Sequence, residues 1–140
     1  MKKILLLTLG VLFLSCGKKK EDDFYSKSND NLEKSISRGE IVYNDLCMTC
    51  HLGNGKGVPR AFPPLADSDY LKNNQEASIK GIKYGMSGEI VVNGVTYNSV
   101  MATMGLDDQE IADVMNYINN SWGNSFGEMV TAEKVTKITP

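Results

Sequence analysis

The chain has 140 residues, enough for one domain with a single core. Its 15 basic and 17 acidic side chains are nearly balanced, so we expect no nucleic-acid partner. It contains one histidine, His51, and three cysteines, Cys16, Cys47 and Cys50. A single histidine excludes a site built from a histidine pair, and an odd number of cysteines argues against a disulfide framework.

The first residues predict export. Residues 1–3 are a short basic start, and residues 4–14 are an apolar run. This layout is typical of a secretory signal peptide and is shorter than the roughly 20 residues of a membrane-spanning helix. The run ends at Cys16 after a small residue, which resembles a bacterial lipoprotein cleavage site, although Phe13 stands where leucine is usual. We expect a signal peptide over 1–15 and lipid on Cys16; the alternative is an ordinary signal peptide with a chance cysteine.

The segment after the signal peptide is rich in lysine and acidic residues. Residues 16–30 include almost no apolar side chains beyond Phe24 and Tyr25, so they cannot pack a core. We expect a flexible tether here. The protein would then be exported and held by its lipid on a bacterial membrane, facing the periplasm or the cell surface.

The first of two predicted amphipathic helices begins near Asp30, where an acidic cap is followed three residues later by Glu33. Its apolar positions recur at helical spacing and would form one buried stripe: Leu32, Ile36, Tyr43 and Leu46. Gly39 interrupts this helix at a cost of about 1 kcal/mol relative to alanine. The interruption indicates that another backbone approaches closely there.

The second helix begins at Asp107, which forms a capping box with Glu110, and ends at Gly123. Its apolar residues again follow one face: Ile111, Val114, Met115, Ile118 and Trp122. The two helices alone would suit any small α protein. The residues that directly follow the first helix form a more specific pattern.

The run Cys47-Met48-Thr49-Cys50-His51 follows the first helix and has the C-x-x-C-H pattern of c-type haem attachment. Two thiols three residues apart on one helical turn can bond to the two vinyl-derived carbons on one edge of a haem. The histidine that follows then faces the iron as its first axial ligand. The pattern predicts one covalently attached haem c held by Cys47, Cys50 and His51.

Three other uses of a C-x-x-C pair compete with this interpretation. A thioredoxin-like redox pair would open a helix after a strand, whereas here a helix precedes the pair. A zinc site needs about four ligands, and no cysteine or histidine follows His51. A structural disulfide would leave His51 without a role. The three alternatives stay open at this point.

From about residue 32 to residue 124 the chain resembles the class I cytochromes c. In that family a glycine lies eight residues before the first haem cysteine and an aromatic residue lies four before it, the positions of Gly39 and Tyr43. Tyr117 matches the aromatic residue of the family's C-terminal helix. The resemblance implies an all-α cytochrome c fold with three to four helices around one haem.

Residues 90–97 predict an addition to the minimal fold. Asn93-Gly94 lies between β-branched residues, which is the pattern of a tight β-hairpin. A bacterial subgroup of the family with a Trp-Gly-Asn ending, here at residues 122–124, carries something similar. We expect a cytochrome c domain over 31–124, with the hairpin just before the loop of the axial methionine, and a tail over 125–140.

The run Phe62-Pro63-Pro64-Leu65 resembles the proline loop of the family. The resemblance implies that the Pro63 carbonyl accepts a hydrogen bond from the ring nitrogen of His51 that does not bind iron. It also implies that Leu65 lines the haem edge. Such a hydrogen bond fixes the orientation of the imidazole and makes it a better donor to iron.

The sixth iron ligand must be something other than a second histidine, and methionine is the usual choice opposite histidine. Of the seven methionines, position in the chain leaves Met101 and Met104, both just before Asp107. Family members place the ligand in a Met-Pro motif shortly before the last helix. Residues 97–102 match that position, with Ala102 in place of the proline, so the resemblance implies Met101, with Met104 as the alternative.

Haem iron held by two protein ligands cycles between ferrous and ferric states, so the sequence predicts an electron carrier and not an enzyme. A peroxidase would need an open iron position and a distal histidine, and His51 is already assigned. A haem-based redox or gas sensor with a displaceable methionine remains the alternative. The expected partners are redox proteins such as a reductase, an oxidase or a dehydrogenase, together with the membrane that holds the anchor.

Overall fold

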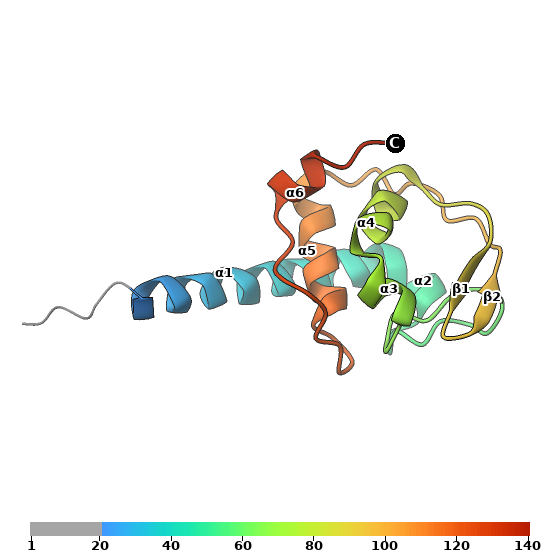
Figure 1. Cartoon of the computed structure of the whole chain (residues 1–140), viewed down its shortest axis with the longest axis horizontal. Helices are drawn as coiled ribbons and strands as arrows, with labels where there is room; N and C mark the ends of the chain where they lie inside the picture. Colours follow the sequence, from blue (N-terminus) through green and yellow to red (C-terminus); the bar gives the residue numbers. More distant parts are fainter. Residues whose placement is uncertain (1–20) are drawn as a thin grey trace, which may run out of the picture.

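The computed structural model describes the backbone of residues 21–140 and the side chains from residue 31 onward, so the predicted signal peptide and Cys16 lie outside it. In chain order the helical segments are α1 (Glu21–Val42), the π-helical turn η1 (Tyr43–Cys47), α2 (Met48–His51), α3 (Asp69–Asn73), α4 (Gln75–Tyr84), α5 (Asp108–Asn119) and α6 (Ala132–Thr136). Strands β1 (Ile90–Val92) and β2 (Val95–Tyr97) form one antiparallel pair. The long segments α1, α4 and α5 account for the expected helices, and the short α2, α3 and α6 are additional (Figure 1).

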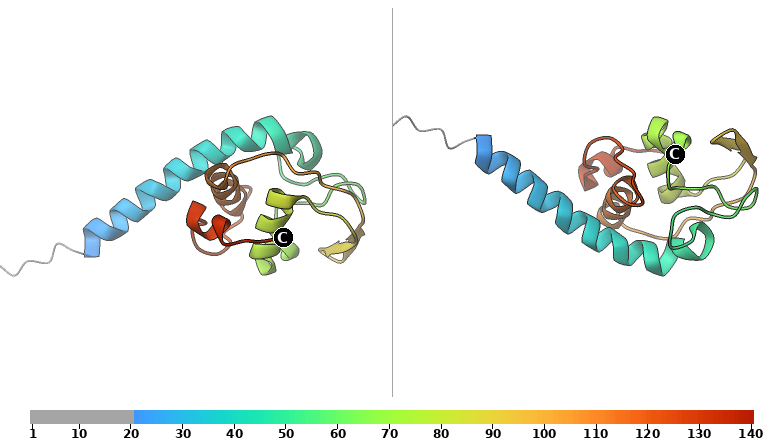
Figure 2. Two further views of the ribbon diagram at one scale, coloured as in Figure 1. Left: turned by 90° about the horizontal axis from the view of Figure 1, so that it is seen from above. Right: turned by 90° about the horizontal axis from the view of Figure 1, so that it is seen from below.

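Helix α1 is longer than the sequence predicts. It begins at Glu21, and this differs both from the expected start near Asp30 and from the flexible tether expected over 16–30. No proline or glycine interrupts the chain between Glu21 and Arg38, and a helix that packing has nucleated extends at little cost. The first half of α1 projects beyond the rest of the fold (Figure 2). Within residues 21–140 no helix combines the length and the apolar composition needed to cross a bilayer.

Helices α1 and α5 cross at Gly39, where the sequence predicts a close approach. A Cβ atom on Gly39 would lie 2.0 Å from the carbonyl oxygen of Asp113 and 2.9 Å from the Cβ atom of Tyr117. Beside this contact the rings of Tyr43 and Tyr117 pack with their centroids 5.2 Å apart. Leu46, which helical spacing puts on the same buried stripe, instead lines a cavity beside the C-x-x-C-H motif. The π-helical turn is wider than an α-helical turn and rotates the residues after Tyr43 off the stripe.

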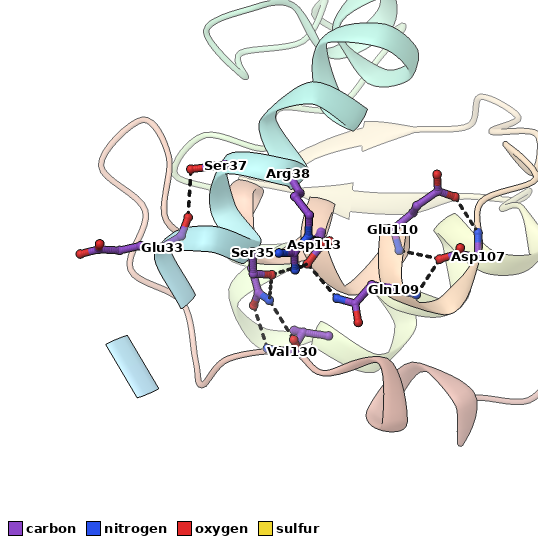
Figure 3. Close-up of polar contacts among 10 residues, drawn as sticks. Glu33, Ser35, Ser37, Arg38, Asp107, Gln109, Glu110, Asp113 and Val130 are labelled. Carbon is purple, nitrogen blue, oxygen red and sulfur yellow. Dashed lines mark hydrogen bonds and ion pairs between the residues drawn. The ribbon is translucent and has the colours of Figure 1, made fainter. Parts of the chain in front are cut away.

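A buried carboxylate joins α1 to α5 (Figure 3). The side chain of Asp113 accepts hydrogen bonds from Ser35 Oγ at 2.5 Å, from Arg38 Nε and Nη2 at 2.6 and 2.8 Å, and from Gln109 Nε2 at 2.9 Å. Asp113 is 2% exposed, so burying its charge is favourable only because these donors surround it. In the part of the chain that the structure describes, every buried side-chain nitrogen and oxygen has a hydrogen-bond partner.

Helix α5 begins as predicted and ends earlier than predicted. Asp107 and Glu110 form the reciprocal capping box. The helix ends at Asn119 rather than Gly123, and Trp122 lies beyond it with φ +54°, where its Nε1 donates to the Gly53 carbonyl at 3.0 Å. The indole thereby packs against the Tyr43 and Tyr117 rings from outside the helix, at centroid distances of 5.0 and 5.6 Å.

The tail over 125–140 packs into the same core as the helices. Val130 and Val135 are 1% and 0% exposed, and α6 lies against α5 (Figure 1). The side chain of Asn116 donates to the Val130 carbonyl at 2.8 Å and accepts from the Val130 amide at 2.7 Å. The tail is therefore an integral part of the fold.

Candidate functional site

The C-x-x-C-H motif lies on the wall of a cavity. The turn η1 and helix α2 carry Cys47, Cys50 and His51, and all three line a cavity of about 260 Å³. The hairpin and the loop before α5 contribute further wall residues, including Tyr97 and Met101. No aspartate, glutamate, lysine or arginine lines this cavity, so it suits a large apolar group.

A second compartment of about 90 Å³ shares part of this wall. Cys47, His51, Pro63 and Met101 line both compartments, whereas Leu65 lines only the second. The proline loop and the motif therefore meet at the same place, although twelve residues separate His51 from Pro63 in the chain.

His51 is held in the form that can bind a metal. Its Nδ1 lies 3.0 Å from the carbonyl oxygen of Pro63. A carbonyl only accepts hydrogen bonds, so Nδ1 carries the proton and Nε2 keeps its lone pair free. Burial lowers the pKa of His51 below its ordinary value, although the bond to Pro63 opposes this. The imidazole is therefore neutral at neutral pH, as a metal ligand must be.

The environment of the two cysteines disfavours the competing interpretations. Cys47 and Cys50 form no disulfide with each other, and burial raises the pKa of the Cys47 thiol to about 11. A thioredoxin-like pair needs a thiol whose pKa is lowered, because the thiolate is the nucleophile. Among the side chains that the structure describes, no three or more histidine, cysteine, aspartate and glutamate residues are grouped to hold a metal ion, whereas a zinc site needs about four ligands.

The candidate methionines occupy different parts of the site. Met101 lines both compartments, as His51 does, whereas Met104 lines only the larger one. The structure adds Met86, which also lines both compartments and which is not among the methionines that the sequence predicts as ligands. Met86 and Met101 exchange two backbone hydrogen bonds of 2.8 Å. No pattern in the sequence indicates this pairing, because the hairpin separates the two residues.

The hairpin forms part of the site wall. Ile90 lies opposite Tyr97, and both line the larger cavity. Asn93 and Gly94 have φ values of +51° and +75°, the left-handed values that a two-residue turn requires, so the predicted hairpin is confirmed. The sequence predicts the position of the hairpin. The alternation of side chains between the two faces of the strands would have indicated that one face is buried.

The residues around the cavity fit a covalently bound haem. The site offers two thiols at the attachment spacing, one imidazole with a free nitrogen, thioether sulfurs and an uncharged wall. Sulfur and imidazole donors are common axial ligands of haem iron, and an apolar surrounding suits the macrocycle.

Comparison with known proteins gives the family. The family model described as cytochrome c matches residues 36–122. The chain belongs to the cytochrome c family. Cytochrome c-552 of Thermus thermophilus is 41% identical to it over 101 residues, which cover 66% of this chain and 77% of the relative.

Two other relatives are parts of larger enzymes. The cytochrome c subunit of a quinone alcohol dehydrogenase from Gluconobacter oxydans is 34% identical over 122 residues, which cover 84% of this chain and 25% of the subunit. The FixP subunit of a cbb3-type cytochrome c oxidase from Azorhizobium caulinodans is 27% identical over 117 residues, which cover 80% of this chain and 38% of that subunit.

Family membership confirms several predictions. Cytochromes c bind covalently attached haem c, and Cys47 and Cys50 have the spacing of the attachment motif, so the cofactor is haem c. The family carries electrons without being catalytic, so this cytochrome is an electron carrier and not an enzyme. The mostly helical fold with its small two-stranded sheet is the predicted fold class.

Proposed function

We propose that this cytochrome is a single-haem electron-transfer protein in which His51 and Met101 are the axial ligands of the iron. The observation that carries the proposal is the shared cavity: the motif and Met101 line the same uncharged space, although 50 residues separate His51 from Met101. The bound haem would supply a one-electron couple between ferrous and ferric iron.

Each residue of the site has one task in this proposal. Cys47 and Cys50 hold the macrocycle by thioether bonds. His51 binds through Nε2, because Pro63 fixes Nδ1 as a donor. Met101 supplies the second axial ligand, and Leu65 lines the haem edge. With His51 and Met101 both bound, the iron would have no position open to a small molecule.

Covalent attachment is tested by denaturing electrophoresis with haem staining. The double variant Cys47→Ser/Cys50→Ser should lose all haem stain, because both linkages are removed, and each single variant should lose most of it. Thr49→Ser lies between the two cysteines and serves as the matched control, which should stain like the unmodified protein. Haem that stays on the double variant through denaturation would rule out these attachment points.

The sixth ligand is tested by the near-infrared absorption of the oxidised protein. Met101→Ala should abolish the weak band of ferric iron–sulfur ligation and lower the reduction potential. Met104→Ala should leave both nearly unchanged, and so should Met86→Leu, the control within the same cavity. The opposite pattern would move the ligand to Met104.

A haem-based redox or gas sensor is the alternative function, since Ala102 replaces the proline that usually follows the ligand. A carbon monoxide titration of the reduced protein at neutral pH distinguishes the two functions. The electron carrier should bind carbon monoxide poorly, because Met101 occupies the sixth position. Ready binding would favour the sensor.

The relatives support redox enzymes as partners. One is the cytochrome subunit of a quinone alcohol dehydrogenase and another is a subunit of a cbb3-type oxidase. We expect this cytochrome to pass electrons to or from a membrane dehydrogenase, reductase or oxidase. Stopped-flow mixing with membranes of the source bacterium should reduce the ferric protein when a dehydrogenase substrate is present. It should oxidise the ferrous protein when oxygen is present.

A lipid on Cys16 would keep the cytochrome at the outer side of a bacterial membrane. The support for this anchor is the signal-peptide pattern before Cys16. Mass spectrometry of the native N-terminal peptide should detect the lipid. Cys16→Ser should leave the haem intact and yield protein that is either uncleaved or released from the membrane. An unlipidated Cys16 in the native protein would remove the anchor.

A further inference from the structure

The loop that carries Met101 lies between the cavity and the surface. Val100, Met101 and Ala102 line the cavity, and Thr103 is exposed. On its N-terminal side the hydroxyl of Ser99 donates to the carbonyl of Ala61. A thioether is a neutral ligand on a flexible side chain, so the surrounding contacts decide how firmly the loop is held.

On its C-terminal side the loop is attached to the end of α4. Met86 follows α4, and its amide and carbonyl pair with those of Met101 at 2.8 Å each. Thr103 Oγ1 donates to the Lys83 carbonyl at 3.2 Å. Gly85 has φ +84°, and a Cβ atom on it would lie 3.0 Å from the Met101 carbonyl oxygen. The position of Met101 therefore follows the position of the last turn of α4.

The tail holds that same turn from the other side. Lys83 Nζ donates to the Val135 carbonyl at 2.9 Å, and Tyr84 Oη donates to the Ile138 carbonyl at 2.9 Å. Lys83 also pairs with Asp108 at 3.1 Å, and Thr136 Oγ1 donates to the other carboxylate oxygen of Asp108 at 2.7 Å. Val135 is fully buried, so the tail is a fixed point for these bonds.

We propose that the tail over 125–140 is a strap that positions the axial methionine. The tail fixes Lys83 and Tyr84 in the last turn of α4, and the last turn of α4 fixes the Met101 loop. The proposal rests on the proposed role of Met101 as sixth ligand. Lys83 and Tyr84 are positioning residues that act through Met86 and Thr103, and neither of them lines the two compartments. Breaking the strap raises the population of a form in which the sixth position is open.

The test variant is Lys83→Met/Tyr84→Phe in the full holoprotein, because it removes the two bonds to the tail, together with the Lys83–Asp108 pair, and keeps the apolar part of each side chain. The probe is imidazole, titrated into the oxidised protein while the near-infrared band is followed. Imidazole binds only where the methionine has left, so its apparent affinity measures how often the loop opens. We expect the double variant to bind imidazole on the order of tenfold more tightly.

The matched control is Lys137→Met. Lys137 lies on the same tail and pairs with Glu133 at 2.8 Å on the protein surface, with no bond to α4. This variant should bind imidazole like the unmodified protein. The titration contains no denaturant, so a general loss of stability would leave the affinity nearly unchanged.

A second readout does not depend on the iron. The amides of Met86 and Met101 are both engaged in the backbone pair, and their hydrogen exchange should quicken in the double variant and stay slow in Lys137→Met. Unchanged imidazole affinity with unchanged exchange, or an equal increase in the control, would overturn the proposal. A near-infrared band that is absent from the unmodified protein would instead refute the ligand assignment, which keeps the two failures distinct.

Discussion

Two glycines set the distances at which chain segments meet around the haem site. Gly57 has φ +61°, its amide donates to the His51 carbonyl at 3.0 Å, and a Cβ atom on it would lie 2.6 Å from the carbonyl oxygen of Pro63. The absence of a side chain therefore lets the proline loop reach His51. Gly39 does the same for the crossing of α1 and α5.

Gly39→Ala should destabilise the holoprotein by about 3 kcal/mol or more, since both contacts of the added methyl group are with atoms of a packed helix. Urea unfolding followed by circular dichroism measures this difference. The control is Gly53→Ala, because a Cβ atom there meets only the flexible side chain of Met48, whose sulfur lies at 3.4 Å. A loss below about 1 kcal/mol in Gly39→Ala would show that the two helices can move apart at low cost.

At the scale of one element, α5 depends on its N-terminal cap. Asp107 Oδ1 accepts from the amides of Gln109 and Glu110 at 2.8 Å each. Asp107→Ala should lower the free energy of unfolding by about 1 kcal/mol, because two amides lose their acceptor. Asp107→Asn should recover most of this loss, as asparagine also caps well. An equal loss in both variants would assign the effect to charge instead of capping.

The pair between Asp108 and Lys83 makes the stability depend on pH. Hydrogen bonds from Thr136 and Lys83 lower the pKa of Asp108. Desolvation lowers the pKa of Lys83, but the hydrogen bond to Asp108, the charge of Asp108 and the interaction with Tyr84 together outweigh it and raise this pKa. The carboxylate therefore contributes stability above its unfolded pKa of about 4, and this is lost as pH falls through the lower folded pKa. The ammonium contributes below about pH 10 and is lost as pH rises through its higher folded pKa.

Asp108→Asn should therefore flatten the fall of the urea midpoint between about pH 5 and pH 3. The control is Asp45→Asn, at an exposed position just before the C-x-x-C-H motif. This variant should keep the pH dependence of the urea midpoint that the unmodified protein has. The same slope in Asp108→Asn and in the unmodified protein would mean that other carboxylates cause the acid sensitivity.

At the scale of the whole molecule, the network around Asp113 holds three parts of the chain together. Ser35 and Arg38 come from α1, and Asp113 comes from α5 (Figure 3). Asn116, also on α5, donates to Ser35 Oγ and to the carbonyl of Val130 in the tail. A substitution at one residue of this network therefore affects the packing of α1, α5 and the tail together.

Arg38→Ala should cost about 2 kcal/mol of unfolding free energy, between the values for exposed and buried ion pairs, because Asp113 is buried and Arg38 is 53% exposed. Arg38→Ala/Asp113→Asn should recover part of this loss, since no uncompensated charge remains. A double-mutant cycle by urea unfolding measures the coupling. A coupling energy near zero would show that the Arg38–Asp113 pair contributes no more to stability than an exposed surface ion pair.

Short-range patterns in the sequence determined the haem-attachment motif, one helix start and the hairpin turn. The motif from Cys47 to His51, the cap at Asp107 and the turn at Asn93-Gly94 each act within a few residues, so their local chemistry is sufficient to predict them. Gly39 is a partial exception. Its unusual place in a helix indicated a close neighbour, and only the resemblance to cytochromes c indicated which helix that is.

Tertiary structure alone decided the remaining features. The pairing of Met86 with Met101, the place of Leu46 on the cavity wall and the packing of the tail into the core depend on segments far apart in the chain. Such contacts form only when burial elsewhere has brought the segments together, so no local pattern encodes them. The sequence by itself therefore determined the haem attachment and the family, and tertiary packing decided which methionines share the cavity with His51 and what holds them there.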